Sequence, residues 1–301
     1  MTTGTATIID GQSMAATLRA QVAQDVRDLS CSGVTPGLAV IMVGDNPASD
    51  IYVRNKIAAC DSVGIKSFEH RLPASATQND VQELIVRLNA DKSVHGILLQ
   101  LPIPMHLNSK ILLQAIDPAK DVDGLHPYNI GLLISGLPGP VPCTPMGCMM
   151  LVKSVRGNNL SGLTAIVIGS SLLFGKPMGQ LLLNENCTLI QAHSKTRDLP
   201  DLCRRADLVF VATGQPGLVK ADWIKHGATV IDIGITRKNS GSITGDVDFY
   251  GVSKVAGAIT PVPGGVGPMT ITCLLINTVE ATKTKTGTED KENGKTGTGH
   301  N

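Results

Sequence analysis

The sequence predicts an α/β fold of two domains, each built on a mostly parallel sheet. Three observations support this prediction. Short apolar runs typical of buried strands alternate with helical patterns along most of the 301 residues. The alternation breaks once, in a Gly- and Pro-rich stretch, and then restarts. The chain also has 32 glycines and only 3% aromatic residues, a composition that favours α/β construction with many tight turns.

The first half contains four strand patterns separated by three helical patterns. In order they are a strand at 6–10, a helix at 14–29, a strand at 38–44, a helix at 48–63, a strand at 65–72, a helix at 78–89 and a strand at 96–104. This order is typical of β-α-β units, whose strands pair in parallel. We therefore expect a first domain over residues 1–140.

The pattern breaks between Leu125 and Pro145, where GLLISGLPGPVPCTPMG predicts an interdomain linker. Strand patterns separated by helical patterns then return at 163–169, 187–194, 206–214 and 228–234. We expect these elements to form a second domain over residues 141–269.

The run PMTITCLLINTVEAT begins with Pro268 and Thr270, which suit a helix start, and predicts a helix over residues 270–282. Because this helix is apolar on more than one face, we expect it to pack back against the first domain. From Lys283 onward the chain is polar and rich in Lys, Thr and Gly. Residues 283–301 are therefore expected to be a disordered tail.

The composition favours a globular enzyme of the cytoplasm. A formal net charge of +1 provides no attraction to nucleic acid or to an anionic membrane, so neither is an expected partner. No apolar stretch reaches membrane-spanning length, and the first residues fit neither a secretory signal nor a transit peptide. The seven cysteines include no C-x-x-C pair and are odd in number, which predicts reduced thiols.

Residues 165–178, AIVIGSSLLFGKPM, have the strand, glycine turn and helix start that dinucleotide-binding folds use. Gly169, Ser171 and Gly175 are small where a pyrophosphate would approach, and Pro177 suits the first helical turn. A glycine after a strand is a weak signal alone, because surface turns need glycine as well. The repeated β-α-β context makes nucleotide binding the favoured interpretation.

The end of the next strand indicates which nucleotide binds. A domain selective for NAD carries a carboxylate there, which bonds the ribose 2′-hydroxyl. This strand ends instead in His193, Ser194, Lys195, Thr196 and Arg197, whose donors suit a 2′-phosphate and favour NADP. The alternative is a solvated surface turn, where such residues are common.

Tyr52 and Lys56 lie four residues apart on a predicted helix and therefore on one face. A phenol and an ammonium can together position and protonate a substrate, although surface helices also carry this pair. The Y-x-x-x-K pattern also marks short-chain dehydrogenases, in which it follows the glycine motif. Here it precedes the glycine motif, which excludes that class.

The apolar strand pattern in GILLQLPIP ends in Gln100, and the segment KDVDG supplies Asp121 and Asp123. Because ligands bind at the carboxyl ends of parallel strands, Gln100 is either a ligand contact or a cap for a neighbouring loop. Asp123 suits an acceptor for the N–H groups of a heterocycle, with loop capping as an equal alternative. Asp121 and Asp123 lack the further oxygen ligands of a calcium loop, so no metal is expected.

The segment PVPGGVGPMT, residues 261–270, contains three glycines and three prolines. Such a segment makes a rigid wall without side chains, which a planar ligand can approach closely. A purely structural turn is the alternative.

Eight motifs, in matching order from about Ile8 to Thr282, resemble the bifunctional methylenetetrahydrofolate dehydrogenase/methenyltetrahydrofolate cyclohydrolase family. They are VGDNPASDIYVRNK, GILLQLPIP, KDVDGLHPYN, PCTPMG, GKPM, HSKT, VATGQPG and ITPVPGGVGPMT. The resemblance implies oxidation of 5,10-methylenetetrahydrofolate with NADP, followed by hydrolysis of 5,10-methenyltetrahydrofolate to 10-formyltetrahydrofolate, in one-carbon metabolism. It also implies a homodimer. Each subunit would have an N-terminal catalytic domain, a Rossmann domain that binds the dinucleotide, and a folate held in the cleft between them.

The resemblance also implies a role for each matching residue. Lys56 is the catalytic lysine, Tyr52 the residue that positions the substrate, Gln100 the partner that bonds the lysine, and Asp123 the anchor for the pterin. Pro263, Gly264, Gly265 and Gly267 would lie by the folate and the nicotinamide. The implied cofactor-binding residues are Gly169, Ser170, Ser171, Gly175, Pro177, His193, Ser194, Lys195, Thr213, Gly214, Ile235 and Gly267.

One residue departs from the family pattern. The family loop commonly reads Gly-Arg-Ser, with the arginine on the 2′-phosphate, and this chain has Ser170 there. We expect Ser194, Lys195 and Arg197 to bind the phosphate instead, with lower selectivity over NAD. Two alternative functions stay open: a dehydrogenase with little cyclohydrolase activity, and a non-catalytic folate or nucleotide sensor.

Overall fold

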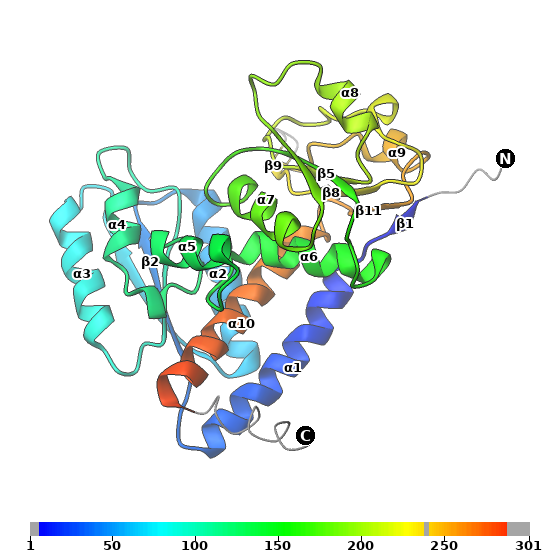
Figure 1. Ribbon diagram of the computed structural model, residues 1–301. Helices are drawn as coiled ribbons and strands as arrows, with labels where there is room; N and C mark the ends of the chain where they lie inside the picture. The colour runs from blue at the N-terminus through cyan, green and yellow to red at the C-terminus, as the bar shows by residue number, and fades with distance from the viewer. Residues whose placement is uncertain (1–5, 238–240, 288–301) are drawn as a thin grey trace, which may run out of the picture. The chain divides into compact units, whose positions relative to one another are not determined.

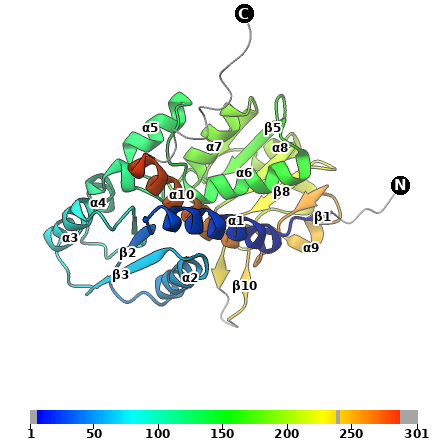
Figure 2. The ribbon, with the colours of Figure 1, turned by 90° about the horizontal axis from the view of Figure 1, so that it is seen from below.

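The computed structural model describes residues 6–237 and 241–287, drawn in Figure 1 and from a second direction in Figure 2. The chain divides into two compact units. Unit 1 contains Met1–Thr17 and Ile130–Cys273, and unit 2 contains Leu18–Asn129 and Leu274–Asn301. The chain passes between the units within α1 (Gly11–Cys31), α5 (Pro127–Ser135) and α10 (Val266–Thr286).

Unit 1 is built on a six-stranded sheet in which every neighbouring pair of strands is parallel. The order is β1-β11-β8-β7-β5-β6. The strands are β1 (Thr7–Ile8), β5 (Thr164–Ile168), β6 (Thr188–Ala192), β7 (Leu208–Val211), β8 (Thr229–Asp232) and β11 (Ala258–Ile259). The central strands β7 and β8 are buried along their whole length, which explains why they are apolar runs without polar alternation.

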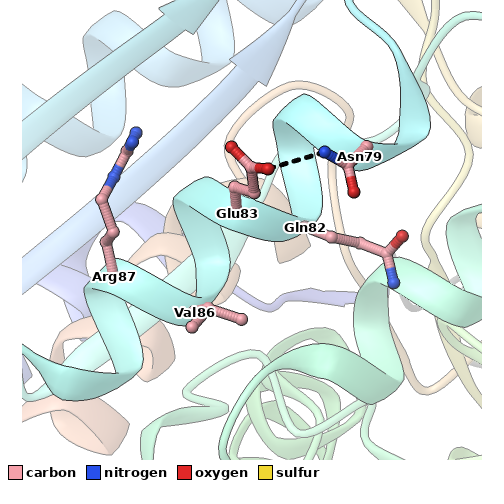
Figure 3. Close-up of a pocket in the computed structure, with 5 residues that line it drawn as sticks. All are labelled: Asn79, Gln82, Glu83, Val86 and Arg87. Carbon is pink, nitrogen blue, oxygen red and sulfur yellow. Dashed lines mark hydrogen bonds between the residues drawn. The ribbon is translucent and has the colours of Figure 1, made fainter.

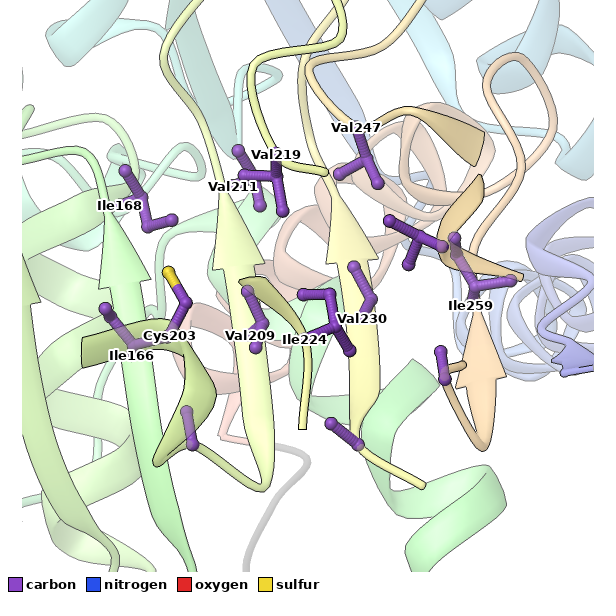
Figure 4. Packing of buried hydrophobic residues seen from close by; sticks show 14 of the residues in the cluster. Ile166, Ile168, Cys203, Val209, Val211, Val219, Ile224, Val230, Val247 and Ile259 are labelled. Carbon is purple, nitrogen blue, oxygen red and sulfur yellow. The ribbon is translucent and has the colours of Figure 1, made fainter. Parts of the chain in front are cut away.

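The core of unit 1 lies on this sheet (Figure 4). Ile166, Ile168, Val209, Val211 and Val230 come from three neighbouring strands and are fully buried. Their register sets where β5, β7 and β8 end, because Ile168 pairs with Val211 and Val209 with Val230. The loops that follow these strands therefore start at one edge of the sheet.

The remaining elements of unit 1 are short helices and one antiparallel strand pair. They are α6 (Cys143–Arg156), α7 (Gly175–Asn184), α8 (Leu199–Arg204), η2 (Ala221–Trp223), β9 (Thr236–Arg237), β10 (Ile243–Thr244) and α9 (Phe249–Val252).

Unit 2 contains a three-stranded parallel sheet in the order β3-β2-β4. Its elements are β2 (Gly37–Val43), α2 (Pro47–Val63), β3 (Lys66–Leu72), α3 (Gln78–Ala90), β4 (Gly96–Leu99), α4 (Ser109–Ala115) and η1 (Pro118–Lys120). Helix α3 begins at a capping box, in which Thr77 and Asp80 bond each other's backbone N–H groups. Its apolar face enters the core of unit 2 with Ile41 and Ile97.

The two parallel sheets confirm the predicted α/β fold, but chain order does not assign every strand to a sheet. The strand pattern at 6–10 is expected within residues 1–140. Instead β1 joins the sheet of unit 1, where Thr7 pairs with Ala258 and Ile8 with Ile259. A two-residue strand needs an existing partner edge, and β11 provides it.

The expected linker is shorter than the Gly- and Pro-rich stretch, because only residues 136–142 lie outside helices and the residues on either side form α5 and the start of α6. Proline is compatible with both helices since it stands in their first turns. Pro127 is the first residue of α5, and Pro145 is the third residue of α6.

Helix α10 is longer than the expected helix at 270–282. It includes Lys283, where the tail was expected to begin, and the Lys283 ammonium pairs with Glu280 at 2.9 Å and with Asp25 at 3.4 Å. Residues 288–301 of the expected tail lie outside the described residues. In the part of the chain that the structure describes, no helix is long and apolar enough to cross a membrane.

Candidate functional site

A hydrogen bond joins two of the predicted catalytic residues. Lys56 lies on α2, and its Nζ donates to Oε1 of Gln100 at 3.0 Å. Gln100 follows β4 directly, and its Nε2 donates to the carbonyl of Leu101 at 2.6 Å. Because both ends of this amide are bonded, it holds the Lys56 amine at the carboxyl end of the sheet. Tyr52, one helical turn earlier on α2, is 38% exposed.

Asp123 lies in a loop that starts beside β4. Asp121 forms a parallel bridge with Ile97 of that strand. Since the bridge is parallel, the chain runs from Asp121 toward the end of β4 that carries Gln100. The side chain of Asp123 is half-buried.

This loop is anchored by the two residues that precede Asp123. The buried carboxylate of Asp121 accepts hydrogen bonds from the His126 N–H at 2.7 Å and from Nδ2 of Asn129 at 2.9 Å. The carbonyl of Val122 accepts one from Nδ2 of Asn277 on α10 at 2.9 Å. Asp121 therefore anchors the loop. The side chain of Asp123, in contrast, is partly exposed to solvent.

The buried side chain of Lys120 connects the start of this loop to the end of α3. The Nζ of Lys120 donates to the carbonyls of Leu88 and Asp91 at 2.8 Å each, at the end of α3. Burial, together with the charge of Lys285, lowers the pKa of Lys120 to about 8. The ammonium satisfies helix-end carbonyls, which is a structural role.

The Gly- and Pro-rich segment at 261–270 leads into α10. Gly264 has a φ of +102°, a conformation that L side chains disfavour. A Cβ on Gly265 would lie 2.6 Å from the Pro261 carbonyl, so packing alone requires glycine there. Pro263 is exposed, and a Cβ on Gly267 would meet nothing described within 4 Å.

The glycine loop of unit 1 connects β5 to α7. Gly169 has a φ of +143°, and a Cβ on Gly175 would lie 2.0 Å from the Gly169 carbonyl. The hydroxyl of Ser171 accepts the Phe174 N–H at 3.2 Å, whereas Ser170 is exposed. Phe174, the N-cap residue of α7, makes no side-chain cap, which leaves the positive end of the helix dipole available to an anion. Pro177 is buried in the first turn of α7.

The turn after β6 is closed by its own residues. The Thr196 hydroxyl accepts the His193 N–H at 2.9 Å, and Nδ1 of His193 accepts the Lys195 N–H at 3.1 Å. These bonds use Thr196 and His193 internally. They leave the side chains of Ser194, Lys195 and Arg197 exposed.

Two buried aspartates of unit 1, Asp232 and Asp246, were not predicted from the sequence as site residues. Asp246 bonds the backbone of Thr213 and Gly214, two of the predicted cofactor residues. Asp232 bonds the backbone of Asp246 itself. A signal was present for Asp232, because an aspartate ends the apolar strand pattern ATVIDIG in the same way that Gln100 ends GILLQ. Ile235, another predicted cofactor residue, is 47% exposed.

A surface pocket of about 420 Å³ lies on α3 (Figure 3). Its lining residues are Asn79, Gln82, Glu83, Val86 and Arg87, and none is a predicted site residue. Asn79 and Glu83 bond each other at 2.7 Å, so their polar ends are partly satisfied. Within residues 6–237 and 241–287, no group of three or more His, Cys, Asp or Glu side chains is placed to hold a metal ion.

Two family models match the chain. The model described as tetrahydrofolate dehydrogenase/cyclohydrolase, catalytic domain, matches residues 9–123. The model described as tetrahydrofolate dehydrogenase/cyclohydrolase, NAD(P)-binding domain, matches residues 142–286. The bifunctional protein FolD of Dinoroseobacter shibae is 58% identical over 284 residues, which cover 92% of this chain and 95% of that protein.

Solved structures agree with these matches. The bifunctional enzyme FolD, methylenetetrahydrofolate dehydrogenase/cyclohydrolase, from Campylobacter jejuni has 48% sequence identity and a TM-score of 0.91, covering 93% of this chain and 99% of that one. The methylenetetrahydrofolate dehydrogenase-cyclohydrolase of Trypanosoma brucei, solved with NADP and an inhibitor, has 38% identity and a TM-score of 0.89. This match covers 93% of this chain and 98% of that one.

Proposed function

The chain belongs to the tetrahydrofolate dehydrogenase/cyclohydrolase family, and from this membership we propose which residues carry each of its two reactions. It is a bifunctional enzyme of one-carbon folate metabolism, a methylenetetrahydrofolate dehydrogenase and a methenyltetrahydrofolate cyclohydrolase. One observation carries the assignment of the reacting site. It is the hydrogen bond between Lys56 and Gln100 at the end of β4, inside the residues matched by the catalytic-domain model.

In the first reaction, the methylene bridge of 5,10-methylenetetrahydrofolate loses a hydride and becomes the 5,10-methenyl cation. The bound nucleotide supplies the hydride acceptor. Because N5 and N10 stabilise the cation, the protein contributes mainly orientation. We assign orientation to the ring of Tyr52 and to the carboxylate of Asp123, which accepts N–H groups of the pterin. Pro263 and Gly264 present a surface with few side chains to the folate.

In the second reaction, water adds to the methenyl carbon, the bond from this carbon to N5 breaks, and one proton is released. The product is 10-formyltetrahydrofolate. Lys56 carries protons between the water and N5, which requires its amine to stay aimed at the reacting carbon. Gln100 orients the amine by accepting a hydrogen bond from it at 3.0 Å.

Residues 142–273 of the match to the family's NAD(P)-binding domain lie in unit 1. The glycine loop fits a pyrophosphate, because Gly169 and Gly175 leave no side chain between the loop and the start of α7. We assign phosphate contacts to Ser170, Ser171 and the first turn of α7. Thr213, Gly214, Ile235 and Gly267 complete the proposed cofactor set.

We further propose NADP as the preferred nucleotide. Ser194, Lys195 and Arg197 are exposed after β6 and offer one hydroxyl and two cations to a 2′-phosphate. The relative from Trypanosoma brucei was solved with NADP. With Ser170 in place of arginine, selectivity over NAD is expected to be modest.

The same family membership supports a homodimer in the cytoplasm. β6 is an edge strand of the unit 1 sheet, and an edge strand can pair with a second copy of the chain. All seven cysteines are free thiols, as a reducing compartment would keep them. Light scattering after gel filtration tests the dimer.

Two separate assays test the proposed function. Oxidation of 5,10-methylenetetrahydrofolate is followed by the absorbance of reduced nucleotide, with NADP and NAD compared as kcat/KM. Hydrolysis of 5,10-methenyltetrahydrofolate is followed without nucleotide. We expect activity in both assays. Oxidation without hydrolysis would identify a monofunctional dehydrogenase, and binding without turnover in either assay would identify a sensor.

A further inference from the structure

The carboxylate of Asp246 is buried in unit 1 and bonds the turn that follows β7. Asp246 is 0% exposed. Its Oδ2 accepts hydrogen bonds from the Thr213 N–H at 2.6 Å, the Thr213 hydroxyl at 3.0 Å and the Gly214 N–H at 2.9 Å. Its Oδ1 is buried without a hydrogen-bond partner among the described residues. Burying a carboxylate in this way is unfavourable for folding alone, which points to a functional reason.

Asp246 is itself held by a second buried aspartate. Oδ1 of Asp232 accepts the N–H groups of Asp246 and Gly234 at 3.0 Å each, and Oδ2 accepts the Val247 N–H at 2.9 Å. A Cβ on Gly234 would lie 2.3 Å from Oδ1 of Asp246, and a Cβ on Gly245 would lie 2.0 Å from Oδ2 of Asp232. The backbone therefore encloses both carboxylates closely, so Asp246 has one position.

This position sets the orientation of the peptide between Ala212 and Thr213. Its N–H points at Asp246, and because a trans peptide is planar, the Ala212 carbonyl points the opposite way. That carbonyl lies against the glycine loop, since a Cβ on Gly169 would be 2.6 Å from it. The Ala212 N–H also donates to the Ile168 carbonyl at 2.9 Å. The two peptides on either side of Ala212 thus connect the turn after β7 to the end of β5 and the loop that follows it.

We propose that Asp246 is a positioning residue for nucleotide binding. By fixing the peptide between Ala212 and Thr213, it holds the turn after β7 and Gly169 at the spacing that receives NADP. Asp246 acts through the backbone of these two loops. The inference rests on the proposed nucleotide site at Gly169–Gly175 and Thr213–Gly214.

The test uses Asp246→Asn in the full chain. The amide keeps one acceptor oxygen but loses the charge that strengthens three hydrogen bonds. We expect the Kd and the KM for NADP to rise roughly tenfold. At saturating NADP, kcat should stay within about twofold, and cyclohydrolase activity, which uses no nucleotide, should be unchanged within about twofold. This split separates positioning from a general loss of structure.

The matched control is Asp248→Asn, which removes the same charge two residues later. The carboxylate of Asp248 accepts a hydrogen bond from the Gly251 N–H at the start of α9, and we expect no change in the KM for NADP. An unchanged Kd for NADP in folded Asp246→Asn would overturn the proposal. So would a parallel loss of dehydrogenase and cyclohydrolase activity. Absence of both activities in the wild-type chain would instead reject the proposed function.

If Asp246→Asn does not fold, hydrogen exchange of the wild-type chain decides. The amide protons of Thr213 and Gly214 should be protected without nucleotide, because Asp246 already bonds them. Free exchange that becomes protected only after NADP is added would overturn the proposal.

Discussion

The amine of Lys56 and the side-chain amide of Gln100, 44 residues apart in the chain, form a hydrogen bond of 3.0 Å. The bond joins α2 to the end of β4. Two residues from different elements are thus held in one geometry before any substrate binds. Preorganisation of this kind lowers the entropy that the reaction must lose on reaching its transition state.

Replacing Lys56 with methionine tests whether this geometry serves catalysis. Met keeps most of the length of the side chain but has no proton to donate or accept. We expect Lys56→Met to lower the kcat of methenyltetrahydrofolate hydrolysis by at least about 100-fold, the usual contribution of a proton-transferring group. The measurement is hydrolysis without nucleotide.

The control is Lys66→Met on β3. Lys66 is exposed and lies over the ring of Phe68 at 4.8 Å, in a different element from Lys56. This variant should hydrolyse at the wild-type rate within about twofold. Wild-type hydrolysis by Lys56→Met would remove Lys56 from the proposed role.

Nucleotide choice is tested at Ser170. Ser170→Arg adds a guanidinium to the exposed glycine loop, where it can bond a 2′-phosphate in two places. We expect the ratio of kcat/KM for NADP to that for NAD to rise roughly tenfold. Steady-state kinetics with both nucleotides measures it.

Leu172→Arg is the matched control for charge alone. Leu172 lies in the same loop and is 38% exposed, so this variant adds the same charge two residues later. An equal gain in NADP selectivity would mean that general attraction, and not a contact at position 170, selects the nucleotide.

The elements with local signals could be predicted from the sequence. β2, β7 and β8 are buried apolar runs, and the capping box of Thr77 and Asp80 marks the start of α3. Tyr52 and Lys56 share a helix face because of their spacing alone. Pairing between strands that lie far apart in the chain could not be predicted in this way. The partner of β1 is β11, and no local pattern encodes a pairing between Thr7 and Ala258.

The same limit explains why Asp246, the proposed positioning residue, was not predicted from the sequence. Asp246 bonds Thr213 and Gly214, which lie more than 30 positions earlier in the chain, and its motif GDVD resembles an ordinary polar turn. The length of the linker was overestimated for another reason. Proline and glycine were interpreted as helix breakers, although Pro127 and Pro145 occupy first turns, where proline lacks nothing that the helix needs.

Asp232 makes the stability of unit 1 depend on pH. Burial and the charge of Asp246 raise the pKa of Asp232 from 3.8 to about 6, against the effect of its backbone hydrogen bonds. The folded state therefore holds this proton more tightly than the unfolded state. The resulting stabilisation is complete below pH 3.8 and is lost as the pH rises through about 6. It amounts to about 3 kcal/mol.

Asp232→Asn removes this titration. We expect the unfolding free energy of the wild type minus that of the variant to fall by up to about 3 kcal/mol between pH 4 and pH 7. Urea unfolding followed by the fluorescence of Trp223, the one tryptophan of the chain, reports unit 1. A difference that stays constant with pH would contradict the raised pKa.

Asp207→Asn provides a comparison of opposite sign in the same unit. Burial raises the pKa of Asp207, but the bonds from Lys225 and the Thr164 N–H outweigh burial, and the net pKa is lowered. Its stabilisation is present above pH 3.8 and is lost at lower pH. The wild-type advantage over Asp207→Asn should therefore not fall between pH 4 and pH 7.

The tight approach of the glycine loop to α7 is tested with a matched pair of glycines. A Cβ on Gly175 would lie 2.0 Å from the Gly169 carbonyl and 2.8 Å from the Ser170 nitrogen, and both are backbone atoms that cannot swing away. Gly175→Ala must displace the loop. We expect a loss of about 1–3 kcal/mol in unfolding free energy and a higher KM for NADP.

Gly131→Ala makes the same chemical change in open space. Gly131 lies in α5, is exposed, and a Cβ there would meet nothing described within 4 Å. Alanine is the better helix former, so this variant should gain up to about 1 kcal/mol with an unchanged KM for NADP. Equal effects of the two substitutions on the KM would show that the contact between Gly175 and Gly169 does not shape the nucleotide site. Opposite effects on stability, with the KM raised only by Gly175→Ala, would assign the glycine requirement to this one contact, because helix propensity alone favours alanine at both positions.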